Sequence, residues 1–275
     1  MCRVLKVSEA GYYKALRNAN KPPKHAALLA QIYEILKEDP ENWNYGVRRI
    51  HLALKLKYGY EGSYSTVNRL CHANGLIIKR KRRPNGITHA DAAAQKSENL
   101  IQQDFTAERP NEKWLTDITE VSCADGKLYL APVFDCYDGA IVGFQMDDNR
   151  AAELCVRALE NAIRKTGARG MILHSDRGSQ YTSGIFRETL KKYDITQSMS
   201  GVGRCYDNAR MESFFATLKK EELYAMDLSK MKISEVRSVI HRFIAYYNLR
   251  RIYTPNGGLP PLVMRRRWFE THAAA

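Results

Sequence analysis

In the first third of the chain, hydrophobic residues recur at the spacing of an α-helix. Two apolar stripes are evident, one of Leu28, Leu29, Ile32, Ile35 and Leu36, the other of Val47, Ile50 and Leu54. A third segment begins after Gly62, with Ser63 or Ser65 as its N-cap, and stops at Gly75, a residue type favoured just past a helix end. The pattern predicts short helices in an arrangement similar to a helix-turn-helix.

From Trp114 the pattern becomes that of strands. Three apolar segments, WLTDITEVSC, KLYLAPVFD and AIVGFQM, are separated by Asp-Gly turns, which predicts an antiparallel meander. A helix that ends at Gly167 should follow, then the strand MILH, a helix near residues 185–192, the strand ITQSM and a long helix over about 209–222. Another helix, carrying Val236, Ile240 and Phe243, precedes an irregular segment, TPNGGLPP.

Three antiparallel strands followed by alternating helices and strands is the element order of the ribonuclease H-like fold. We therefore expect an α/β protein with a ribonuclease H-like (retroviral integrase-like) mixed-sheet core, preceded by a small helical DNA-binding region. The expected boundaries are 1–83 for the basic helical region, 84–107 for a linker, 108–228 for the catalytic core and 229–275 for a C-terminal helix and tail that pack on the core.

Charge supports a nucleic-acid partner for the first region. The chain has 43 Lys and Arg against 30 Asp and Glu, and the first 90 residues alone hold 17 of the former and 6 of the latter. Candidate DNA contacts are Asn68, Arg69 and His72 on the third helix, and the five successive cations Lys79, Arg80, Lys81, Arg82 and Arg83 that follow it. A solvated linker is the alternative interpretation of those five cations.

Other compositional signals are few. The six cysteines show no CxxC spacing, which favours reduced thiols over a zinc site or a disulfide framework. There is no signal-peptide pattern and no run of 18 apolar residues, so we expect a cytoplasmic protein.

Three carboxylates on separate elements suggest metal-dependent phosphoryl transfer, since two divalent ions would each need to touch both the protein and a phosphate. Period-two alternation puts Asp117 inside the first strand, on the same face as Leu115. Asp176 follows the strand MILH, and Glu212 lies on the long helix with 35 residues between the two. Lys219, two helical turns after Glu212, projects from the same helix face.

Each of these acids has an ordinary structural explanation when taken alone: a strand-end acceptor, a helix cap or half of a surface ion pair. Asp135 and Asp138 are the main alternative candidates for a carboxylate of the site on the sheet, but their place beside a Tyr-Asp-Gly turn favours a role in the turn. Asp207 is better interpreted as the cap of the long helix, shared with Asn208. Arg177 and Gln180, in the loop after Asp176, and Asn208 are further candidate DNA contacts.

At these residues the chain resembles a known family, the bacterial insertion-sequence transposases of the OrfB type, an integrase-like group often called the IS-three family. The matching segments are RPNEKWLTDIT, LHSDRGSQYTS, YDNARMESFFATLKKE and the tail FIAYYNLRR with NGGLPP, within about residues 40–263. The resemblance implies Mg²⁺ or Mn²⁺, two ions in the active complex, held by Asp117, Asp176 and Glu212, with Lys219 as the basic residue two turns on.

The resemblance also implies an activity: cleavage at the ends of the element to expose a 3′-hydroxyl, which then attacks another phosphodiester. The partners would be double-stranded DNA, both the terminal inverted repeats and the target, further copies of the chain assembled on it, and an upstream-frame OrfA protein. Two alternatives stay open. One is a metal-dependent nuclease or resolvase of the same fold, and the other is a catalytically inactive DNA-binding regulator of transposition.

Overall fold

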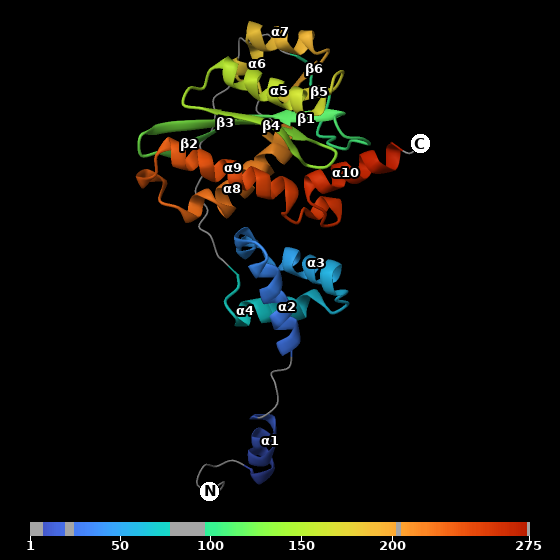
Figure 1. Cartoon of the computed structure of the whole chain (residues 1–275), viewed down its shortest axis with the longest axis vertical. Coiled ribbons are helices and arrows are strands. Elements are labelled where there is room, and N and C mark those ends of the chain that lie inside the picture. Colours follow the sequence, from blue (N-terminus) through green and yellow to red (C-terminus); the bar gives the residue numbers. More distant parts are fainter. Residues whose placement is uncertain (1–7, 20–24, 78–96, 202–204, 274–275) are drawn as a thin grey trace. The chain divides into compact units, whose positions relative to one another are not determined.

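The computed structural model describes residues 8–19, 25–77, 97–201 and 205–273 (Figure 1). The chain divides into two compact units, residues 1–77 and residues 78–275. The first unit is helical. Its elements are α1 (Glu9–Ala19), α2 (Ala26–Lys37), the 3-10 helix η1 (Pro40–Asn44), α3 (Val47–Tyr58) and α4 (Tyr64–Ala73).

Helices α2, α3 and α4 form the apolar core of the first unit. The two stripes expected from the sequence are largely buried there, and Ile32, Ile50 and Leu54 are each 0% exposed. Ser63 is the N-cap of α4, since its Oγ accepts a hydrogen bond from the Thr66 backbone N–H at 3.3 Å. The helix-turn-helix-like arrangement predicted from the sequence is therefore confirmed.

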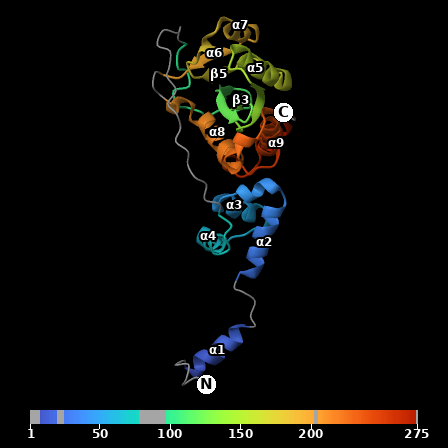
Figure 2. The same cartoon turned by 90° about the vertical axis from the view of Figure 1, so that its left-hand side faces the viewer.

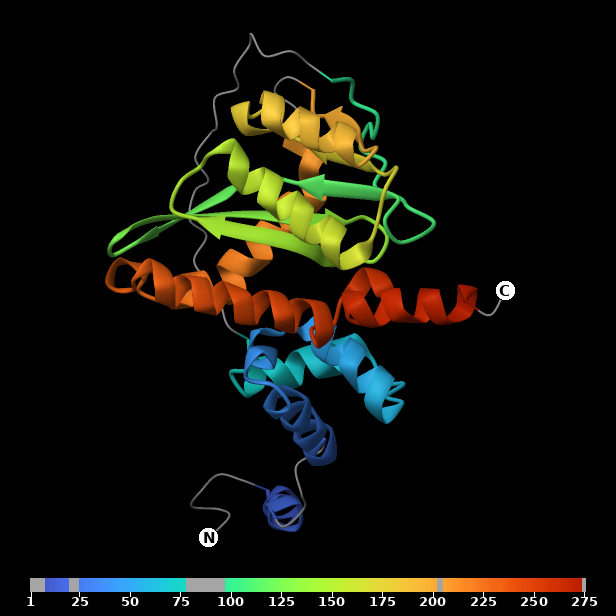
Figure 3. The ribbon, with the colours of Figure 1, turned by 45° about the horizontal axis from the view of Figure 1, so that its top comes forward.

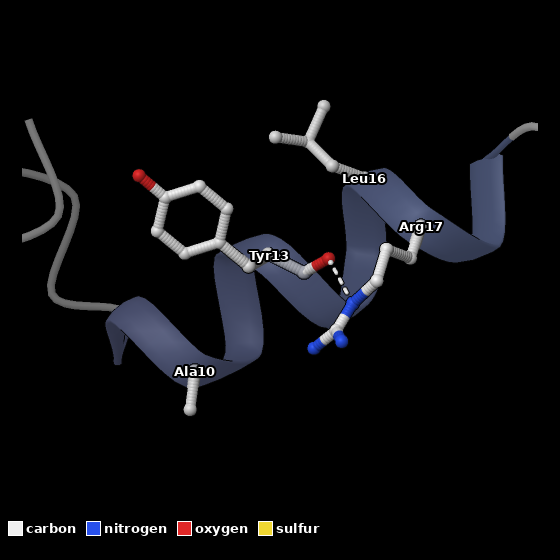
Figure 4. Close-up of a pocket in the computed structure, with 4 residues that line it drawn as sticks. All are labelled: Ala10, Tyr13, Leu16 and Arg17. Carbon is white, nitrogen blue, oxygen red and sulfur yellow. Dashed lines mark hydrogen bonds between the residues drawn. The ribbon is translucent and has the colours of Figure 1, made fainter.

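Helix α1 is exposed along its length. Tyr13 and Leu16 project from it with 59% and 48% of their surface exposed, and Arg17 Nε donates to the Tyr13 carbonyl oxygen at 3.3 Å (Figure 4). Tyr13 and Leu16 are one helical turn apart, so they form a small apolar face on this helix.

The second unit is a six-stranded mixed sheet with helices on both faces. Its strands are β1 (Lys113–Thr116), β2 (Thr119–Cys123), β3 (Gly126–Asp135), β4 (Ile141–Asp147), β5 (Ile172–Ser175) and β6 (Thr196–Met199). Its α-helices are α5 (Ala152–Thr166), α6 (Ser179–Thr182), α7 (Gly184–Lys192), α8 (Ala209–Glu221), α9 (Ile233–Leu249) and α10 (Pro261–His272). Short 3-10 helices lie at η2 (Cys205–Asn208), η3 (Leu223–Ala225), η4 (Leu228–Lys230) and η5 (Thr254–Asn256).

Strand β3 organises the sheet. One of its edges pairs antiparallel with β2 and then with β1, and its other edge pairs antiparallel with β4. Beyond β1 the pairing becomes parallel, first to β5 and then to β6. The ribonuclease H-like mixed sheet is confirmed, but four antiparallel strands stand where three were predicted, because the first apolar segment forms both β1 and β2.

The sheet is covered on both faces, with α5 and α7 on one side and α8 and α9 on the other (Figures 2 and 3). Burial on both faces explains why β1 is apolar at successive positions: Trp114 and Leu115 are both 0% exposed. Helix α5 approaches β4 so closely that a Cβ on Gly143 would lie 2.5 Å from the backbone nitrogen of Ala162.

No helix in the described residues is long and apolar enough to cross a membrane. Four cysteines within the described part, Cys71, Cys123, Cys136 and Cys155, are free thiols. Burial raises the pKa of Cys136 and of Cys155 to about 12, which makes both thiols unreactive at neutral pH.

Candidate active site

Asp117 lies just beyond the end of β1 rather than inside a strand, which corrects the expectation from alternation. The segment expected as one strand is two, β1 ending at Thr116 and β2 beginning at Thr119. Its carboxylate Oδ1 accepts a hydrogen bond from the Ile118 backbone N–H at 2.7 Å. Such a local bond competes with ladder hydrogen bonding, and the strand breaks at the acid.

Asp176 follows the last residue of β5, as the sequence predicts. Parallel pairing sets Lys113 opposite Ile172 and Leu115 opposite His174, and the same register continued by two residues puts Asp117 beside Asp176. Neighbouring strands lie about 4.8 Å apart, so the two carboxylates share one edge of the sheet at the carboxyl ends of parallel strands. The Gly178 backbone N–H donates to Asp176 Oδ1 at 2.9 Å and orients the group.

Glu212 comes from α8, whose start is held against the end of β1. Asn208, the N-cap residue of α8, donates from Nδ2 to the Thr116 carbonyl oxygen at 3.3 Å. Glu212 lies four residues later, on the same helix face as Asn208. It is an exposed residue, in contrast to the two partly buried aspartates.

The charges of the two other acids act on Asp117. Burial, then the charges of Asp176 and Glu212, raise the pKa of Asp117 to about 7, against the opposing effects of the Ile118 N–H and of Lys219. Burial also raises the pKa of Asp176, opposed by the Gly178 N–H and by the charge of Arg150. Partial desolvation of the Glu212 carboxyl group raises its pKa as well.

This donor set fits a divalent cation in its chemistry. Asp117 and Asp176 form no salt bridge with any residue that the structure describes, so two repelling carboxylates stand side by side. Hard oxygen ligands of this kind are those that Mg²⁺ and Mn²⁺ prefer. Within the described ranges, however, no group of three or more His, Cys, Asp or Glu side chains is gathered closely enough to hold a metal. The structure thus pairs the aspartates and leaves Glu212 nearby.

Lys219 lies half-buried on α8, and its charge acts on Asp117. Burial lowers the pKa of Lys219, while the charges of Asp117 and Glu120 favour its protonated form. The lysine therefore lies within electrostatic reach of the carboxylate on β1, a proximity that helix periodicity could not reveal.

A buried hydroxyl pair supports the end of β1, and sequence reasoning missed it. The Thr116 Oγ1 donates to the Pro132 carbonyl oxygen at 2.9 Å and lies 3.2 Å from Tyr181 Oη. Tyr181 is 1% exposed, and burial together with the charges of Cys155, Asp117 and Asp176 raises its pKa well above the ordinary value. The phenol therefore stays neutral and can fix the residue that precedes Asp117.

The interpretation of Asp207 as a helix cap is wrong. Asp207, 1% exposed, accepts hydrogen bonds from Asn99 Nδ2 at 2.9 Å, Gln103 Nε2 at 3.1 Å and the Gly201 backbone N–H at 2.8 Å. Asn208 makes no side-chain cap bond either. Instead, Asp207 ties the segment that enters the core to the segment that begins α8, and we call this set of three bonds the Asp207 staple.

Asp135 and Asp138 have the predicted turn role and a second one. Asp135 Oδ1 accepts from the Tyr137 backbone N–H, and Asp138 Oδ1 accepts from the Ala140 backbone N–H, at 2.9 and 2.8 Å. Both carboxylates, each 0% exposed, also pair with Arg265 of α10, at 2.5 Å for Asp135 and 2.7 Å for Asp138. Only the fold brings the arginine to the turn.

The candidate DNA contacts of the core are held by backbone groups. Arg177 Nε donates to the Ser200 carbonyl oxygen at 2.6 Å, and Gln180 Nε2 donates to the Arg150 carbonyl oxygen at 3.0 Å. Gln180 and Asn208 are buried, and the Asn208 Oδ1 atom has no hydrogen-bond partner among the described residues. Their contact with DNA stays a prediction.

The candidate DNA contacts of the first unit lie on α4. Arg69 and His72 are exposed, and Asn68 is half-buried. The five cations at 79–83 lie outside the described residues. No contact in the structure tests either group, so both stay predictions.

Comparison with known proteins agrees with this architecture. Two "Integrase core domain" families match residues 107–205 and 193–261, and an "HTH-like domain" family matches residues 24–84. The chain is 35% identical to the putative transposase InsK for insertion sequence element IS150 of Escherichia coli strain K12, over 98% of this chain and 93% of that protein. It is 33% identical to the transposase InsF for insertion sequence IS3A of the same strain, over 95% and 91%.

A solved structure shows the same fold. A chain of the simian T-cell lymphotropic virus intasome aligns over 82% of this chain and 74% of its own length, with a TM-score of 0.51 and 16% identity. The catalytic core domain of HTLV-2 integrase aligns over 58% of this chain and 99% of its own, with a TM-score of 0.48 and 19% identity.

Proposed function

Since this chain belongs to the IS-three family of insertion-sequence transposases, enzymes with an integrase core, we propose that it cleaves DNA at the ends of its element and joins the freed 3′-hydroxyl to another phosphodiester. The observation that carries the proposal is the register that sets Asp117 beside Asp176 at one edge of the sheet, with α8 and Glu212 against the same strand end.

In this proposal Asp117, Asp176 and Glu212 hold two divalent metal ions. When bound, Mg²⁺ or Mn²⁺ would supply the Lewis acidity that in-line displacement at phosphorus requires. Asp117 and Asp176, which the sheet sets side by side, would bind the metal first, and Glu212 would complete the site from α8. Lys219 would bind a phosphate near the carboxylates and orient the DNA strand.

The chain's regions divide this work. We assign duplex DNA recognition to residues 1–83, through Asn68, Arg69 and His72 and the cations at 79–83, and the chemistry to residues 108–228. Residues 84–107 connect the two, and residues 229–275 pack on the core. Arg177, Gln180 and Asn208 would contact DNA at the site, and the active form would be an assembly of several copies on DNA, acting in the bacterial cytoplasm with an upstream-frame OrfA protein.

One assay tests the activity directly. The purified chain is incubated with a supercoiled plasmid that carries the ends of the element, with Mg²⁺ or with a chelator, and nicked, linear and joined products are separated. Cleavage at the element ends that requires Mg²⁺ is expected. Asp117→Asn, Asp176→Asn and Glu212→Gln should each abolish it, because each removes a ligand charge without changing side-chain size.

A matched control is Glu188→Gln, which changes an exposed glutamate on α7 and should leave cleavage intact. Transfer of a labelled 3′-hydroxyl end into a second DNA molecule separates a transposase from a nuclease or resolvase of the same fold, because hydrolysis alone gives no joined product. DNA binding without any cleavage, with all three carboxylates present, would instead support the regulator.

A further inference from the structure

Strand β4 borders an open hollow of about 530 Å³ at the outer edge of the sheet. The strand contributes its segment from Val142 to Met146, and α5 and α9 flank it on the two faces of the sheet (Figure 3). Because β3 lies between β4 and β1, this hollow is separate from the paired aspartates. The proposed DNA cleavage and joining gives this hollow no role.

The lining of the hollow is cationic. Helix α5 contributes Arg164 and Lys165, and α9 contributes Arg237 and His241, whereas no carboxylate is among the lining residues. Arg164 and Lys165 are exposed. Both arginines are also held in place, since Arg164 Nη2 donates to Asn161 Oδ1 at 2.7 Å and Arg237 Nη1 donates to the Met146 carbonyl oxygen at 2.8 Å. Each guanidinium keeps further N–H groups for a ligand.

An open sheet edge commonly accepts a strand from another chain, but this edge is blocked. The Phe144 carbonyl oxygen accepts from Asn161 Nδ2 at 3.1 Å, and the Met146 carbonyl oxygen accepts from Arg237 Nη1. These two carbonyls are two residues apart, so both face outward from the strand, and side chains already occupy the acceptors that an added strand would need. Strand addition is therefore disfavoured, and a negatively charged ligand that binds the cationic side chains is favoured.

We propose that this hollow binds the phosphodiester backbone of duplex DNA, as a second DNA contact apart from the site of chemistry. Arginine forks and a lysine around a groove without carboxylates match a row of phosphates, and α5 and α9 supply cations from both sides of it. The Phe144 ring packs edge-on against His241, with 5.0 Å between the ring centroids, and both residues line the hollow. Contacts of this kind position DNA without reading its sequence.

The test is the salt dependence of DNA affinity for the full-length chain. Arg164→Glu with Lys165→Glu should reduce the slope of log affinity against log salt by about 2, since each lost phosphate contact lowers it by about 0.9. The loss should be the same for duplexes of any sequence. The matched control is Arg266→Glu with Arg267→Glu, which makes the same change in net charge at two adjacent, exposed residues of α10.

An equal fall in slope for the two double variants would show a general charge effect and overturn the proposal. An unchanged slope for the α5 variant, with a changed oligomeric state in light scattering, would assign the hollow to contact between copies of the chain. Thermal unfolding of each variant at the wild-type temperature shows that a changed slope is not the result of misfolding. Arg164→Lys should retain the wild-type slope even if affinity falls, because the slope depends on the number of phosphates that are neutralised and lysine keeps the charge.

Discussion

Burial and neighbouring negative charges together raise the pKa of Asp117. Its pKa of about 7 in the folded chain, caused first by burial and then by Asp176 and Glu212, lies well above the value of about 3.9 for an exposed aspartate. Between these two values the folded chain binds more protons than the unfolded chain does. The stability that this proton contributes is therefore present at low pH and is lost as the pH rises through 7.

This loss of stability with rising pH gives a prediction for the metal-free protein. The melting temperature should fall as the pH is raised from 5 to 8, and Asp117→Asn should flatten the fall because the amide does not titrate. Millimolar Mg²⁺ should raise the melting temperature at pH 8 and have little effect at pH 5, where the carboxyl group holds its proton. Differential scanning calorimetry measures all of these. An equal response to Mg²⁺ in Asp117→Asn would remove this residue from the metal site.

Lys219 gives a second prediction at the scale of one residue. Its helix offset of seven places it about 10 Å along the axis from Glu212, too far for an ordinary ion pair. We expect Lys219→Ala to weaken binding to the terminal DNA and slow cleavage, whereas Lys219→Arg retains much of both, because a phosphate accepts either cation.

The same substitution tests a finer point of the electrostatics. The charge of Lys219 lowers the pKa of Asp117, so the alanine variant should need a slightly higher pH for the same Mg²⁺ affinity and keep that affinity above pH 8. Isothermal titration measures it. Metal binding lost at every pH, with DNA affinity intact, would assign the lysine to the carboxylate site rather than to DNA.

At the scale of elements, the Asp207 staple determines how α8 begins, and α8 carries Glu212. Its three donors lie 108, 104 and 6 residues away in the chain. Asp207→Ala would remove the acceptor of these donors, of which Asn99 and Gly201 are half-buried and Gln103 is exposed. The cost is about 1 to 3 kcal/mol for a donor that water cannot reach and small for one that it can. We expect lower stability and, because the start of α8 loosens, a loss of cleavage larger than the loss of DNA affinity.

A milder pair of changes separates positioning from stability. Asn99→Ala and Gln103→Ala remove donors from the segment that enters the core and leave α8 itself unchanged. If the staple positions Glu212, both variants should lower the turnover of cleavage at saturating DNA, and raised Mg²⁺ should restore part of it. Full turnover in the two variants, measured with the plasmid assay, would reduce the staple to a fold-stabilising contact.

The elements also show what sequence can and cannot predict. Periodicity and Asp-Gly turns predict the order of strands and helices, because these signals are local. The break of the first strand at Asp117 escaped prediction, since alternation continues through it and only the bond from the Ile118 N–H reveals the break. The role of Asp207 escaped prediction for a different reason. Two of the side chains that donate to its carboxylate lie about a hundred positions away in the chain, and a helix cap was the only local explanation.

At the scale of the whole molecule, the buried Arg265 joins α10 to the turn that follows β3. Arg265→Met should destabilise the core by about 3 to 5 kcal/mol, because it leaves Asp135 and Asp138 as uncompensated buried charges. Burial raises the pKa of Asp138 to about 6, with Arg265 opposing the rise, so the variant should recover part of the loss below that pH as Asp138 takes up a proton. Urea unfolding at pH 5 and pH 8 measures both effects.

The neighbouring Arg266→Met is the control for that experiment. It changes an exposed arginine of the same helix, and substitutions at such positions alter stability by no more than about 0.5 kcal/mol. Equal destabilisation by the two variants would mean that helix α10 as a whole, and not the ion pair, holds the structure.

The pairing of Arg265 with Asp135 and Asp138 also has a consequence for folding during protein synthesis. On the ribosome, the two aspartates are synthesised 130 and 127 residues before the arginine that neutralises them. A nascent chain therefore carries these two acids unpaired at the turn after β3 until α10 has emerged, and domains fold as units once their contacts are complete. A product truncated before α10 should be degraded rather than accumulate, so an element with a damaged 3′ end would produce no folded competitor for the DNA that an intact copy needs.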